Sequence, residues 1–128
     1  MSVIRHTGLV TKNIKKSLKF WTKYLNFKIK KEMNESGNLI DKIMLYKNVN
    51  VKTYKLEDKN KCLLELLYFK NPPNKRNSKI KPYTNGFTHI SLTVKNINLL
   101  YKYLRSKKIK FNSKPQKSED GNVIMTYC

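Results

Sequence analysis

Hydrophobic and polar positions in the first half of the chain follow two different periods. Residues 3–10 alternate with the two-residue period of a strand, whereas residues 14–25 place apolar side chains at helical spacing. Residues 27–33 and 49–56 again show the pattern of strands. The stretch at residues 39–45 stays open, because its apolar side chains fit either a strand or a short helical turn.

The most apolar run of the chain, residues 62–69, predicts a strand that is covered on both faces. Glu65 lies in the middle of this run. A carboxylate is costly to bury without a partner, so Glu65 needs one. Both a metal ion and a lysine satisfy that need, and the sequence leaves both open.

The second half of the chain repeats the same order in shortened form. Residues 71–85 are rich in proline and basic side chains and predict an irregular linker. A strand at residues 87–94, a helix at residues 97–104 and a short strand at residues 109–111 are predicted next. Residues 122–128 begin another strand. The unit strand–helix–strand–strand–strand is therefore complete once and incomplete the second time.

A repeated tripeptide fixes the register between the two units. Lys-Asn-Ile occurs at residues 12–14 and at residues 95–97, where its asparagine is the expected helix N-cap. The chain's two histidines, His6 and His89, have the same offset of 83 residues (89 − 6 and 95 − 12). A lone strand histidine is more often structural than a ligand, but the matching register favours a shared site. Together with Glu65, these side chains are typical ligands of a divalent first-row metal.

The composition adds a large positive charge. The net charge is +20, yet only three of the 28 basic residues are arginine, and the lysines are spread over the whole length. Arginine is the preferred residue for base readout and bidentate phosphate binding, so this pattern argues against nucleic acid as the main partner. The charge can still steer a small anionic substrate towards a cleft.

Targeting and redox signals are absent from the sequence. No apolar run approaches the roughly 18 residues of a membrane helix, and the N-terminus has no signal-peptide core. Cys62 and Cys128 make neither a disulfide framework nor a metal-type pair. We therefore expect a cytoplasmic protein without a membrane partner.

Five short motifs, in the order in which they occur along the chain, resemble motifs of the vicinal-oxygen-chelate superfamily, also called the glyoxalase/bleomycin-resistance/dioxygenase fold. Their combination and order support the resemblance more than any single motif does, and together they extend over nearly the whole chain. The matching segments are residues 4–10, 17–21, 24–27, 63–66 and 86–90.

The resemblance implies an α+β fold of two βαβββ modules packed side by side, with a mixed, curved sheet around a cleft. We expect one glyoxalase-like domain over residues 1–128, with module 1 at about residues 3–69, a basic linker at residues 70–86 and module 2 at about residues 87–128. The family continues with a segment similar to Asp-Pro-Asp-Gly-Asn-Leu-Ile-Glu, and this chain ends at Cys128, before such a segment begins. We therefore expect a truncated second module that lacks its last strand.

The resemblance also implies the site residues. The metal ligands are His6 and Glu65 in the first module and His89 in the second, whereas the fourth ligand, normally a glutamate, belongs to the segment beyond Cys128. Glu65 is also the candidate catalytic base, which takes and returns a proton next to the metal. The implied cofactor is a divalent metal ion (Zn, Ni, Mn, Fe or Co).

These features favour a glyoxalase-like, metal-dependent lyase or isomerase, similar to lactoylglutathione lyases or epimerases. It would act on a small carbonyl or thioester substrate through metal-stabilised enediolate chemistry, and we expect it to form a homodimer. One alternative is an extradiol-type dioxygenase. The other is a non-catalytic small-molecule binding protein of the bleomycin-resistance type, with an aromatic ligand cleft. The aromatic candidates for that cleft are Trp21, Phe27, Tyr54 and Tyr68.

Overall fold

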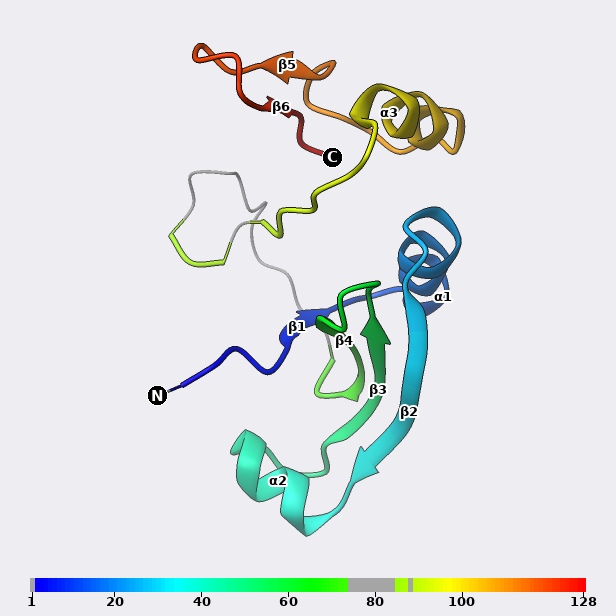
Figure 1. Cartoon of the computed structure of the whole chain (residues 1–128). Coiled ribbons are helices and arrows are strands. Elements are labelled where there is room, and N and C mark those ends of the chain that lie inside the picture. Colours follow the sequence, from blue (N-terminus) through cyan, green and yellow to red (C-terminus); the bar gives the residue numbers. More distant parts are fainter. Residues whose placement is uncertain (1, 74–84, 88) are drawn as a thin grey trace. The chain divides into compact units, whose positions relative to one another are not determined.

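The first half of the chain forms a four-stranded mixed sheet, and the whole chain divides into two units, residues 1–78 and 79–128. This computed structural model describes residues 2–73, 85–87 and 89–128 (Figure 1). Strands and helices together confirm the predicted α+β class. The packing of two modules side by side around a cleft, the second without its last strand, stays a prediction.

The sheet of the first unit has the strand order β1-β4-β3-β2. Its strands are β1 (Thr7–Val10), β2 (Lys28–Ser36), β3 (Asn50–Glu57) and β4 (Leu63–Asn71). β1 runs parallel to β4, whereas β3 is antiparallel to both β4 and β2 (Figure 1). The apolar strand β4 therefore lies inside the sheet, between β1 and β3.

A helical segment connects β1 to β2. It consists of α1 (Ile14–Leu18) and the π-helical turn η1 (Lys19–Tyr24). Asn13 caps α1 as predicted, because its side-chain oxygen accepts the backbone N–H of Lys16 at 3.0 Å. Asn26 has a φ of 61° and ends the helical segment in the left-handed conformation that asparagine tolerates.

The core of the first unit lies between this helical segment and one face of the sheet. Its buried members are Trp21, Tyr54, Leu56, Leu64 and Leu66. Side chains alternate along a strand, so Thr53, Lys55 and Glu65 lie on the opposite face of the sheet. We call the face that carries Lys55 and Glu65 the site face.

The open question at residues 39–45 is decided in favour of a helix. α2 (Asn38–Met44) follows Gly37, whose φ of 96° belongs to the region that glycine adopts without strain. The carboxylate of Asp41 then accepts the backbone N–H groups of Asn48 and Val49, at 2.8 and 2.7 Å. These bonds fix the path of the chain into β3.

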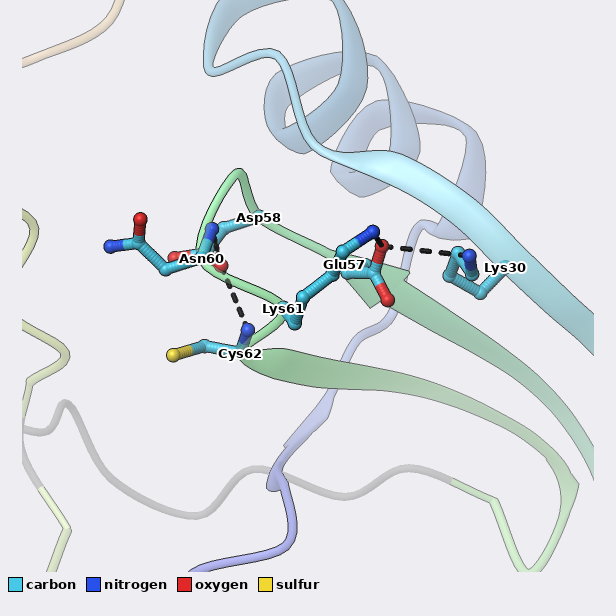
Figure 2. A network of polar contacts seen from close by, with 6 residues as sticks. All are labelled: Lys30, Glu57, Asp58, Asn60, Lys61 and Cys62. Carbon is cyan, nitrogen blue, oxygen red and sulfur yellow. Dashed lines mark hydrogen bonds and ion pairs between the residues drawn. The ribbon is translucent and has the colours of Figure 1, made fainter.

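A carboxylate also shapes the turn that joins β3 to β4. Oδ1 of Asp58 accepts the backbone N–H groups of Asn60 and Cys62, at 2.9 and 2.8 Å (Figure 2). The backbone of Asp58 bonds the carbonyl of Cys62 at 3.1 Å and closes the turn. Because a turn sets the register of the strands it joins, this turn helps to place Lys55 opposite Glu65.

Glu57, at the end of β3, is held by two lysines next to the same turn. Its Oε1 lies 3.2 Å from Nζ of Lys61 and 3.5 Å from Nζ of Lys30 (Figure 2). Burial acts to raise the pKa of the Glu57 carboxyl, but the two lysines together hold that pKa below its ordinary value of 4.5. Glu57 therefore stays ionised in the folded protein to a lower pH than in the unfolded chain.

The second unit contains one long helix and a short hairpin. α3 (Ile97–Ser106) is capped as predicted by Asn96, whose side-chain oxygen accepts the backbone N–H of Leu99 at 3.0 Å. β5 (Gln116–Lys117) and β6 (Ile124–Met125) pair in antiparallel orientation. In the described part of the chain, no helix combines the length and the apolar character that crossing a membrane requires.

Two predictions about the second half of the chain were wrong, because the described residues of 87–94 and residues 109–111 form no strand. The strand predicted at residues 122–128 is present but shorter, as β6. A strand exists only where a neighbour pairs with it, and alternation along the sequence supplies no such neighbour. β4 also continues to Asn71, so the predicted linker begins later, and residues 74–84 lie outside the described residues.

Replacement of a core leucine should destabilise the first unit. Leu66 has no exposed surface, so Leu66→Ala should lower the free energy of unfolding by about 2–5 kcal/mol, through lost burial and the cavity left behind. Urea denaturation followed by the fluorescence of Trp21, the chain's one tryptophan, measures the change. Leu39→Ala is the control, because Leu39 is 74% exposed. Equal losses in the two variants would show that Leu66 is not a core residue.

The ionised carboxylate of Glu57 should stabilise the folded protein at neutral pH but not at acid pH. The pKa of Glu57 is lower in the folded protein than in the unfolded chain. Its contribution to the free energy of unfolding is therefore present above the unfolded pKa and is lost as the pH falls through the folded pKa. Wild type should therefore exceed Glu57→Gln in unfolding free energy at pH 7, and the difference should shrink below about pH 4.5. Urea denaturation across this range, with Glu119→Gln as the control, checks the prediction. A difference that does not vary with pH would contradict it.

Candidate functional site

His6 and Glu65, two of the three predicted ligands, lie next to each other on the site face. Gly8 is opposite Glu65 in the parallel β1–β4 ladder, and His6 precedes Gly8 by two residues, so it falls on the same face. Nε2 of His6 lies 3.4 Å from Oε2 of Glu65. The strand pairing thus brings together two side chains that are far apart in the sequence.

Glu65 is largely withdrawn from water, whereas His6 remains accessible. The side chain of Glu65 is 14% exposed and that of His6 is 34% exposed. A carboxylate in this position needs charged or hydrogen-bonding partners. His6 lies beside this carboxylate on its more exposed side.

Lys55 is the second partner of Glu65. The two residues are opposite each other in the β3–β4 ladder, and Nζ of Lys55 lies 3.8 Å from Oε1 of Glu65. The sequence left open whether a lysine or a metal ion is the partner of Glu65, and the structure contains the lysine. Lys55 lies at Oε1 of Glu65, whereas His6 faces Oε2. Reasoning from the sequence missed Lys55, because only the strand register identifies it among the many lysines.

His89, the third predicted ligand, belongs to the second unit. Its ring contacts the ring of Tyr127 edge-on, with centroids 5.5 Å apart and planes at 73°. It lies in the non-helical stretch before α3, next to Thr88, which is outside the described residues. A site shared by His89 with His6 and Glu65 stays a prediction.

The geometry of His6 and Glu65 fits a shared divalent ion. Nitrogen and oxygen ligands about 2.0–2.2 Å from one tetrahedral or octahedral ion are roughly 3.0–3.5 Å apart, and the observed separation is 3.4 Å. Histidine nitrogen and carboxylate oxygen are also the donors that such ions accept. Within the described residues, neither unit brings together three His, Cys, Asp or Glu side chains as a metal cage. The first unit therefore offers two candidate ligands, and further ligands would have to join them.

The aromatic residues considered for a ligand cleft have a different role. Trp21 and Tyr54 are buried members of the core, and Phe27 packs against it. The rings of Trp21 and Phe27 meet edge-on, with centroids 5.1 Å apart. Tyr68 is half-buried and follows Leu64 and Leu66 on the same side of β4. These side chains stabilise the sheet on the face opposite Glu65.

Comparisons with known proteins agree with this architecture. A family model described as Glyoxalase/Bleomycin resistance protein/Dioxygenase superfamily matches residues 3–126. No curated protein matches the chain. Among solved structures, a glyoxalase family protein from Bacillus cereus is similar with a TM-score of 0.82 and 14% identity, over 91% of this chain and 78% of that protein. The trypanothione-dependent glyoxalase I of Leishmania major is similar with a TM-score of 0.63 and 17% identity, over 98% of this chain and 78% of that enzyme. At these identities the structural likeness concerns the fold alone.

Proposed function

The chain belongs to the glyoxalase/bleomycin resistance protein/dioxygenase superfamily, and we propose that it is a metal-dependent lyase or isomerase of a small carbonyl or thioester substrate. The observation that supports this function most is the His6–Glu65 pair, with Nε2 and Oε2 3.4 Å apart on the site face. This distance suits two ligands of one ion, and the pair lies where solvent and small molecules reach it.

The proposed metal ligands are His6, Glu65 and His89. When bound, a divalent ion supplies a Lewis acid that polarises a carbonyl oxygen of the substrate. His6, just before β1, and Glu65, in the neighbouring parallel strand β4, would hold the ion. The histidine of the second unit would add a third ligand.

Glu65 is the proposed general base. Its carboxylate takes a proton from the carbon next to the polarised carbonyl and returns that proton in the second half of the reaction, so an isomerisation needs no other reactant. Apolar neighbours on β4, Leu64 and Leu66, anchor the strand in the core and keep the carboxylate in place. Lys55 at the other oxygen restricts its rotation further.

A second candidate is a non-catalytic protein that binds a small organic molecule. The observation that favours it is the Lys55–Glu65 ion pair at 3.8 Å, because it neutralises the carboxylate without a metal. In that case the purified protein takes up no metal and binds its ligand tightly. The predicted homodimer and cytoplasmic location belong equally to both candidates.

Removal of a proposed ligand should release the metal. After incubation with zinc and desalting, His6→Ala, Glu65→Gln and His89→Ala should each retain at most about a tenth of the zinc bound by wild type, since each loses one ligand. Elemental analysis measures the content. Glu35→Gln is the matched control, because Glu35 is a carboxylate of the same sheet whose oxygen accepts the hydroxyl of Thr53 at 2.9 Å.

Unchanged zinc content in all three variants would refute the metal-dependent function. Proton exchange at the carbon next to a substrate carbonyl, followed by NMR in deuterated water, then separates the remaining roles. A lyase or isomerase exchanges this proton, and Glu65→Gln loses the exchange. Oxygen consumption with a catechol and iron would instead indicate the dioxygenase.

A further inference from the structure

Two lysines stand in one row with Glu65 on the site face. Lys55 is opposite Glu65 in the β3–β4 ladder, and Lys31 is opposite Lys55 in the β2–β3 ladder. Side chains directly opposite each other in antiparallel strands have Cβ atoms about 4.5–5.5 Å apart, and like charges in that position repel. Lys55 thus lies between a carboxylate and a second ammonium group.

One carboxylate does not neutralise this row. Among the described residues, Lys31 forms no ion pair with an acidic side chain. The side chains of Lys55 and Glu65 are 26% and 14% exposed, so water screens their charges only in part. Lys31, Lys55 and Glu65 together therefore carry one net positive charge next to His6.

The two oxygens of Glu65 connect this charge to the proposed metal site. Oε2 faces Nε2 of His6 at 3.4 Å, whereas Oε1 faces Nζ of Lys55 at 3.8 Å. A cation held by His6 and Glu65 is repelled by the ammonium group on the other oxygen. An anion that pairs with Lys55 weakens this repulsion and leaves more of the carboxylate's charge to the cation.

We propose that Lys31 and Lys55 bind an anionic group of the substrate, a carboxylate or a phosphate, and that this binding strengthens the metal site at His6 and Glu65. The inference rests on the proposed function and narrows its substrate to a small carbonyl compound with an anionic group near the reacting carbonyl. Lys55 acts as a substrate-binding residue and as a positioning residue for Glu65. By linkage, metal and anion tighten each other's binding by the same factor.

The test measures zinc affinity by isothermal titration calorimetry on the full chain, in sodium chloride and in sodium sulfate of equal ionic strength. Sulfate is the probe for the anionic group. Wild type should bind zinc about five- to tenfold more tightly in sulfate. Lys55→Met should bind zinc about tenfold more tightly than wild type in chloride, because one positive charge is gone, and should show no further gain in sulfate. Lys31→Met should show a reduced sulfate effect.

The controls separate charge at the site from charge elsewhere. Lys52→Met removes a lysine of the same strand whose partner is Glu32, and it should behave like wild type in both salts. Pairing of zinc with sulfate in solution lowers the free zinc equally for all variants, so the sulfate-to-chloride affinity ratio of wild type is compared with that of Lys55→Met. Lys55→Gln is the second variant if Lys55→Met does not fold, and thermal unfolding of each variant shows whether it is folded.

Each outcome decides the inference. Equal zinc affinity of wild type and Lys55→Met in both salts, with binding abolished by His6→Ala, overturns the inference and leaves the proposed function intact. A sulfate effect that persists in Lys55→Met also overturns it. Absence of zinc binding from wild type and Lys55→Met alike overturns both proposals. Zinc binding by Lys55→Met alone, with none by wild type in either salt, also overturns the inference, because no anion then strengthens the wild-type site.

Discussion

A carboxylate held inside the most apolar strand is the constraint on which the first unit depends. Glu65 lies between Leu64 and Leu66, which are both buried in the core. Burial of these leucines directs the carboxylate to the opposite face of the sheet, where its charge must be met. Lys55 in β3 meets this charge, and His6, just before β1, lies beside the other carboxylate oxygen.

The central position of β4 in the sheet determines which side chains lie beside Glu65. A central strand has two neighbours, so the side chains beside Glu65 are set by one parallel and one antiparallel register. A shift by one residue in either ladder would turn Glu65 towards the core, and such a shift is excluded by the cost of burying its charge there. The turn closed by Asp58 fixes the antiparallel register from one end. Packing and electrostatics therefore select the same pairing.

Local features of the fold could be predicted from the sequence, because they depend on neighbouring residues. Asn13 and Asn96 cap α1 and α3 where the repeated tripeptide indicated. Strand pairing depends on residues far apart, so alternation at residues 89–94 did not suffice to make a strand. The partner of Glu65 was open for the same reason, since Lys55 is identified only by the ladder that joins β3 to β4. A site shared by His89 with His6 and Glu65 stays a prediction for the same reason.

The large excess of lysine makes the few carboxylates of the first unit informative. All six of its acidic side chains have partners that explain their place in the fold. Glu32 and Glu57 pair with lysines, Glu35 accepts a hydroxyl, and Asp41 and Asp58 accept backbone N–H groups. Glu65 has such a partner too, because the ammonium of Lys55 neutralises its charge. Folding therefore does not require His6 beside the same carboxylate. The histidine is the feature that stability leaves unexplained, and this surplus supports the proposed role of Glu65.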